Sequence, residues 1–93
     1  MYYEVDEFNY LGGYKIHLKF KNGKSGRIDF TEYLRKGGIF SKFSDINFFK
    51  QVYINPEFGV LTWPGGIDIA PETIYSKATG EPLPDWIEIE IEE

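Results

Sequence analysis

The sequence predicts an α+β domain: a small twisted antiparallel sheet of four to five strands with two or three short helices packed on one face. The main observation is that apolar and basic side chains alternate strictly over 14–21, which is typical of a half-buried strand. A second alternating segment follows at 27–30, after an Asn-Gly pair typical of hairpin turns. Further on, capping residues and prolines bound several short helices and strands.

The hydrophobic pattern decides the register of this hairpin. A two-residue loop at 22–23 would place Ile28 on the face that carries the lysines, which the pattern forbids. A three-residue loop at 21–23 pairs Ile16 with Ile28, and Gly23 then takes the left-handed position of a bulged turn. The same register pairs Tyr14 with Phe30, Leu18 with Gly26, Phe20 with Lys24, Lys15 with Asp29 and His17 with Arg27.

Three short helices are expected. Thr31 as N-cap and Gly37 beyond the end predict the first over 32–36. After a loop at 38–44, Ser44 or Asp45 caps a second helix that runs to about residue 51. Pro71 begins the third, which runs to about residue 78.

Three further strands are expected besides the hairpin. They cover 3–10, 52–54 and 60–63, and the last two are antiparallel across the turn at 55–59. Strict alternation over 86–92 also has β periodicity. The predicted core is mostly aromatic and comprises Tyr14, Phe20, Phe30, Phe40, Phe43, Phe49, Trp63 and Tyr75.

The 93 residues suffice for one domain, which we place at 1–84, followed by an acidic β-like segment at 85–93. That segment holds the whole net charge of −5, since 1–84 contain ten bases and ten acids. The absence of cysteine excludes disulfides and thiolate zinc sites, and a single histidine excludes a histidine cluster. No metal or cofactor is expected. No apolar run reaches the roughly 18 residues of a membrane span and no secretory signal begins the chain, so a cytoplasmic protein is expected.

The basic face of the hairpin is a candidate anion-binding surface. It comprises Lys15, His17, Lys19, Lys21 and Arg27. Clustered cations attract nucleic acid in a salt-dependent manner, but such binders usually add exposed aromatic residues, and here the aromatic residues point inward. A solvated face, or one covered by the acidic strand at 86–92 of the same chain or of a second copy, is the favoured interpretation.

The loop from Trp63 to Glu72 is the candidate partner-binding surface, with Trp63 as anchor and Asp68 as polar contact. Structural roles are the favoured interpretation: Asp68 would accept backbone N–H groups, and Glu72 would lie in the first turn of a helix. No catalytic constellation is found. His17 has no nearby Ser, Cys or carboxylate in the sequence except Asp29 across the strand, so an enzyme is not expected.

The run Trp63-Pro64-Gly65-Gly66-Ile67-Asp68, continuing through Pro71-Glu72-Thr73-Ile74-Tyr75, resembles domain of unknown function 2442, a family of small bacterial proteins. The resemblance extends over about 3–78 and includes the hairpin at 18–30. It implies an α+β domain without an established catalytic residue. Members are often encoded beside a second small family suspected of toxin activity, which implies an antitoxin-like role. Others continue into a helix-turn-helix domain.

Two functions follow from the sequence. The favoured one is a non-catalytic protein-binding module whose partner is a protein, such as a small basic toxin. The alternative is a nucleic-acid-associated regulator that uses the basic face. A homodimer formed through the strand at 86–92 is a further expectation, and no membrane association is expected.

Overall fold

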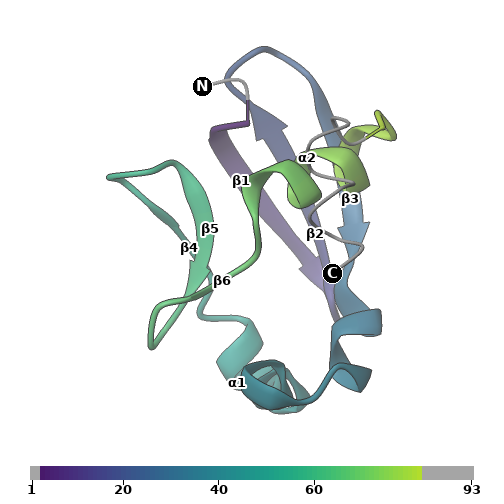
Figure 1. The fold of residues 1–93 in the computed structure, drawn as a ribbon, viewed down its shortest axis with the longest axis vertical. Helices are drawn as coiled ribbons and strands as arrows, with labels where there is room; N and C mark the ends of the chain where they lie inside the picture. Colours follow the sequence, from purple (N-terminus) through teal and green to yellow (C-terminus); the bar gives the residue numbers. More distant parts are fainter. Residues whose placement is uncertain (1–2, 83–93) are drawn as a thin grey trace, which may run out of the picture.

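Two three-stranded antiparallel sheets and short helices make up the protein in a computed structural model that describes residues 3–82 (Figure 1). Sheet A has the order β1-β2-β3 and comprises β1 (Val5–Gly12), β2 (Lys15–Phe20) and β3 (Ser25–Asp29). Sheet B has the order β4-β5-β6 and comprises β4 (Tyr53–Asn55), β5 (Val60–Trp63) and β6 (Ile67–Asp68). The 3-10 helices η1 (Phe30–Arg35) and η2 (Gly38–Ser44) and the α-helices α1 (Ile46–Phe49) and α2 (Pro71–Thr79) complete it.

The predicted register of the β2–β3 hairpin is confirmed. Ile16 pairs with Ile28 and Leu18 with Gly26, while the Phe20 N–H donates to the Lys24 carbonyl at 2.8 Å. Gly23 has φ of 92°, the left-handed backbone that the three-residue loop requires. The apolar side chains of the hairpin are therefore buried on one face, and the lysines and Arg27 are exposed on the other.

Helix α2 covers the inner face of sheet A and packs against β3 and β2 (Figure 1). The contact is closest at Gly26, where an added Cβ would lie 1.6 Å from the carbonyl oxygen of Ala78. Only glycine fits between the sheet and the helix backbone there. The predicted start of this helix at Pro71 is confirmed, and Gly80, with φ of 80°, caps its end.

The prediction of one sheet of four to five strands is wrong, because sheet B forms separately. Gly65 and Gly66 have φ of 89° and 78°, so the chain turns back sharply and lays β6, which was not predicted, along the edge of β5. Because β4 pairs with the other edge of β5, neither edge of β5 is free to pair with a strand of sheet A. The sheets meet where the Val5 N–H donates to the Gly59 carbonyl at 2.8 Å.

Among the helices within residues 3–82, α2 covers a face of sheet A, whereas η1, η2 and α1 lie at one end of that sheet, at the bottom of Figure 1. The predicted helix over 32–36 is a 3-10 helix that begins earlier, because Asp29 rather than Thr31 is its cap: the Asp29 carboxylate accepts the Thr31 N–H at 3.0 Å. The segment at 38–44, expected as a loop, is η2. Asp45, one of the two predicted caps, caps α1, and its carboxylate accepts the Asn47 N–H at 3.0 Å.

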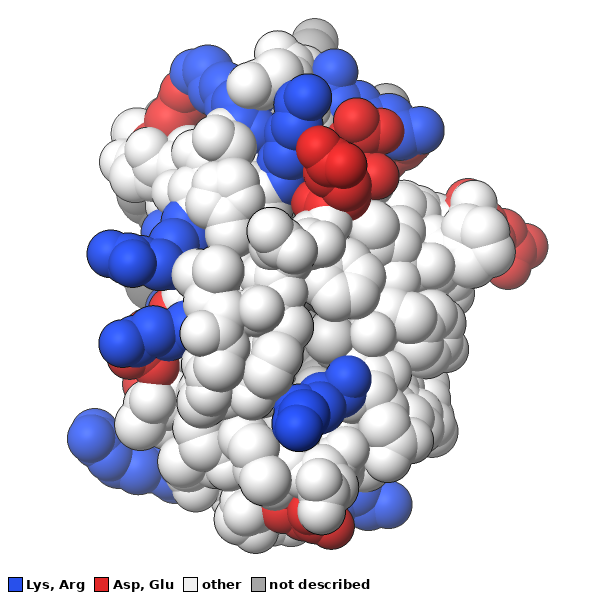
Figure 2. Space-filling view, turned by 180° about the vertical axis from the view of Figure 1, so that it is seen from behind, with Lys and Arg blue, Asp and Glu red and all other residues white. Residues whose placement is uncertain are grey.

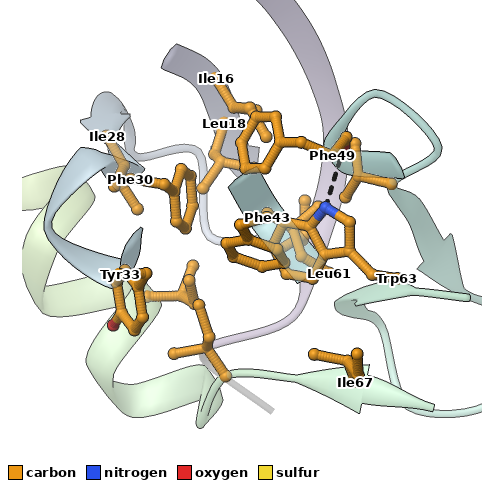
Figure 3. Close-up of a cluster of buried hydrophobic side chains, with 14 of the residues drawn as sticks. Ile16, Leu18, Ile28, Phe30, Tyr33, Phe43, Phe49, Leu61, Trp63 and Ile67 are labelled. Carbon is orange, nitrogen blue, oxygen red and sulfur yellow. Dashed lines mark hydrogen bonds between the residues drawn. The ribbon is translucent and has the colours of Figure 1, made fainter. Parts of the chain in front are cut away.

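Aromatic rings from four elements form the centre of the core (Figure 3). Trp63 of β5 lies with its ring centroid 5.8 Å from that of Phe30, 4.7 Å from Phe43 and 5.7 Å from Phe49. Six of the eight predicted core aromatics are buried, while Tyr14 and Phe40 are partly buried against the cluster. The acidic segment at 85–93 lies outside the described residues, as does its predicted docking on the basic face.

Gly26→Ala should destabilise the protein by about 1–3 kcal/mol or more, because the new methyl group overlaps the Ala78 carbonyl and separates α2 from sheet A. Urea denaturation followed by circular dichroism measures the change. Ser25→Ala at the neighbouring exposed position is the control and should stay within about 0.5 kcal/mol of the parent. A fully stable Gly26→Ala variant would contradict the placement of α2.

Candidate functional site

Trp63, which was expected in the core and was also the candidate surface anchor, is a core residue with an exposed fraction of 0%. Its indole N–H donates to the Phe49 carbonyl at 2.9 Å, drawn as the dashed line in Figure 3. The predicted role as a partner contact is therefore replaced by a structural one. The physical reason is that η2 and α1 fold over the end of β5 and bring Phe43 and Phe49 onto the indole ring.

The structure places Asp68 and Glu72 nearer to the surface. Asp68 is exposed on β6, and its carboxylate makes no hydrogen bond or ion pair with any of residues 3–82, so the expected bonds to backbone N–H groups do not form within that range. Glu72 is half-buried in the first turn of α2, where the helix dipole favours a negative charge.

Asp68 contributes to a hollow that the sequence did not predict. The hollow has a volume of about 360 Å³ and is lined by Glu4, Glu57, Phe58, Val60, Asp68 and Pro71. A smaller hollow of about 40 Å³ adjoins it. Four of the same residues line this second hollow, and Tyr3 lines it as well. We call the two together the Phe58 hollow.

The turn between β4 and β5 presents Phe58 to solvent. The Asn55 side chain accepts the Glu57 N–H at 2.8 Å, and the Gly59 N–H donates to the Asn55 carbonyl at 2.7 Å. Gly59 has φ of 69°, and its carbonyl holds the start of β1 through Val5. Both backbone ends of Phe58 are thus fixed while its side chain is 64% exposed. The sequence signal that could have indicated it is an aromatic residue inside a Pro-to-Gly turn.

The charge at the Phe58 hollow is negative. Glu4, Glu57 and Asp68 reach it from the chain before β1, from the β4–β5 turn and from β6. Glu4 lies 3.7 Å from the Lys21 ammonium group. Among residues 3–82, no basic side chain lies within ion-pair distance of Glu57 or Asp68.

The basic face of the hairpin forms as predicted but carries acids as well. Lys15, Lys19 and Arg27 are exposed and His17 is half-exposed on the outer face of sheet A, where His17 lies opposite Arg27. Strand β1 adds Glu7 and Asn9, and these line a shallow hollow of about 250 Å³ with His17 and Lys19. The distance from Lys19 Nζ to a Glu7 carboxylate oxygen is 4.0 Å.

Asp29 keeps a second negative charge on this face, directly opposite Lys15. Hydrogen bonds from the Thr31 hydroxyl and backbone N–H lower the pKa of Asp29 below its usual value, and Lys15 lowers it further. Lys21 and Lys24, at the hairpin turn, form ion pairs with Glu4 and Glu81. Figure 2 shows the mixing directly: basic and acidic side chains lie side by side at the top of the molecule.

No group of three His, Asp or Glu side chains in residues 3–82 could hold a metal ion. No helix in the same range is long and apolar enough to cross a membrane.

A comparison with known families matches residues 5–80 to the family described as Protein of unknown function (DUF2442). The chain belongs to this family. The DUF2442 match begins at the first residue of β1 and ends just after α2, so it includes both sheets, the buried Trp63 and the whole Phe58 turn. No curated protein and no solved structure matches the chain.

Trp63→Phe should lower the free energy of unfolding by about 1–3 kcal/mol. The substitution reduces the volume of a fully buried ring and removes the shorter of two hydrogen bonds that the Phe49 carbonyl accepts. Denaturation monitored by circular dichroism gives the value, with Tyr53→Phe, at an exposed position of β4, as the control. An unchanged stability, as a surface anchor would show, would refute the core role.

Proposed function

We propose that this DUF2442 protein is a non-catalytic protein-binding module that contacts its partner through the Phe58 hollow. The observation that carries the proposal is the exposed Phe58 ring, held by a fixed turn beside a hollow of about 360 Å³. An aromatic side chain of this kind gives a large contact area at little cost in conformational entropy, and such residues dominate binding energy at protein interfaces.

The position of Phe58 distinguishes it from the other exposed apolar side chains of the described residues. Leu11, Ile39 and Tyr53 are exposed by 46%, 57% and 43% and line neither part of the Phe58 hollow. Phe58 combines the largest exposure with an adjoining concave surface, which a partner side chain could fill. Single exposed apolar residues are ordinary, so it is the adjoining hollow that makes Phe58 the candidate contact residue.

We further propose an antitoxin-like role, in which the partner is a small basic protein encoded beside this one. Two observations support it. The negative charge of the Phe58 hollow complements a basic partner. The resemblance set out above implies that relatives are encoded next to a family suspected of toxin activity.

The alternative function, a nucleic-acid-associated regulator, draws support from Lys15, Lys19 and Arg27 on one exposed face. Glu7 and Asp29 share that face and reduce its positive potential, so we favour the protein-binding function. Fluorescence polarisation with mixed RNA and DNA at low and moderate salt separates the two. An affinity that falls steeply with salt would favour the alternative.

Phe58→Ala should weaken binding of the partner by about 30-fold or more, the effect of removing a central aromatic anchor. The full chain is immobilised, a lysate of the native host is passed over it, and proteins retained in stoichiometric amount are identified. Each candidate is then purified, and its dissociation constant is measured by titration calorimetry with the parent and the variant.

Ile39→Ala is the matched control, because Ile39 is exposed to a similar degree but lies away from the Phe58 hollow. Both variants should keep the parent's stability, since each loses only an exposed side chain. A partner that binds Phe58→Ala as tightly as the parent, or the absence of any stoichiometric partner, would reject the proposal.

A further inference from the structure

The Phe58 hollow has both apolar and acidic lining residues, and we call the acidic ones, Glu4, Glu57 and Asp68, its rim. Phe58, Val60 and Pro71 supply the apolar surface. The carboxylates come from chain segments that are far apart in the sequence, so their convergence is a product of the fold. A purely hydrophobic partner surface would bury these charges without compensation, which is costly.

The carboxylates of the rim differ in how far they are already neutralised. Lys21 lies near Glu4, whereas Glu57 and Asp68 have no basic neighbour within ion-pair distance among residues 3–82. The carboxylates of Glu57 and Asp68 can therefore form ion pairs with a cation of the partner. The volume of about 360 Å³ lies at the lower end of the roughly 300–1,000 Å³ typical of small-molecule pockets, which suits a single side chain.

We infer that the Phe58 hollow binds a segment of a partner protein in which an apolar side chain is flanked by Lys or Arg. The apolar side chain packs on Phe58, Val60 and Pro71, and the flanking cations pair with Glu57 and Asp68. This inference rests on the proposed function and specifies the chemistry of the partner. Charge complementarity selects this occupant over an acidic or a neutral segment, because like charges across an interface are strongly unfavourable.

The test uses the full ¹⁵N-labelled chain and capped pentapeptides in which a central Leu is flanked by Lys, by Gln or by Glu. A fourth peptide keeps the two Lys residues and replaces the Leu by Gly. Titration with the peptide in which Lys flanks the Leu, called the Lys-Leu-Lys peptide, should shift the amide resonances of residues 57–60 and 67–70. The shifts should be weaker with the Gln and Gly peptides and absent with the Glu peptide.

Glu57→Gln combined with Asp68→Asn should weaken binding of the Lys-Leu-Lys peptide about two- to thirty-fold, the range expected for two exposed ion pairs. Asp6→Asn combined with Glu7→Gln is the matched control: it makes the same change in net charge at exposed positions that do not line the Phe58 hollow, and should bind like the parent. The control also measures any general attraction of the cationic peptide to this acidic protein.

Equal binding of the Lys and Glu peptides, shifts confined to residues 85–93, or no shift with any peptide would overturn the inference. The outcome is separable from that of the proposed function. A natural partner that loses affinity with Phe58→Ala but not with the Glu57 and Asp68 double variant would leave the binding module standing and reject the basic segment.

Discussion

The packing of Trp63 against three phenylalanine rings is the interaction on which the rest of the structure depends. The indole belongs to sheet B, Phe30 follows the last strand of sheet A, and Phe43 and Phe49 come from η2 and α1. One fully buried ring thus joins sheet B to the segments that carry Phe30, Phe43 and Phe49. In a domain of 93 residues, where burial of apolar area is limited, such aromatic contacts supply a large share of the stability.

The same contact positions the surface that we propose as functional. Trp63 fixes one end of β5, and the β4–β5 turn at the other end is held to β1 through Val5 and Gly59. Phe58 therefore projects from a backbone that is anchored on both sides. The acidic rim depends on the same arrangement, since it brings the start of β1, the turn and β6 together. A change deep in the core should therefore be felt at the proposed binding surface.

Local patterns predicted part of this fold correctly, and tertiary contacts decided the rest. Alternation and turn length sufficed for the β2–β3 register, and Pro71 for the start of α2. The sequence placed Trp63 both in the core and as a candidate surface anchor, because nothing nearby shows that η2 and α1 cover the indole. Strand β6 has two residues, too few to show a period, so its pairing and the division into two sheets could not be predicted. The Phe58 hollow was missed because separate segments line it.

Hydrogen exchange of the Trp63 indole N–H tests the central claim most directly. The proton is buried and bonded to the Phe49 carbonyl, so it should exchange only when the protein unfolds globally. Nuclear Overhauser contacts from the indole to the rings of Phe30 and Phe43 assign the resonance. Exchange as slow as that of the most protected backbone amides is the predicted result. Loss of the signal within the first minutes in D₂O, without those contacts, would contradict an arrangement in which Trp63 joins the two sheets.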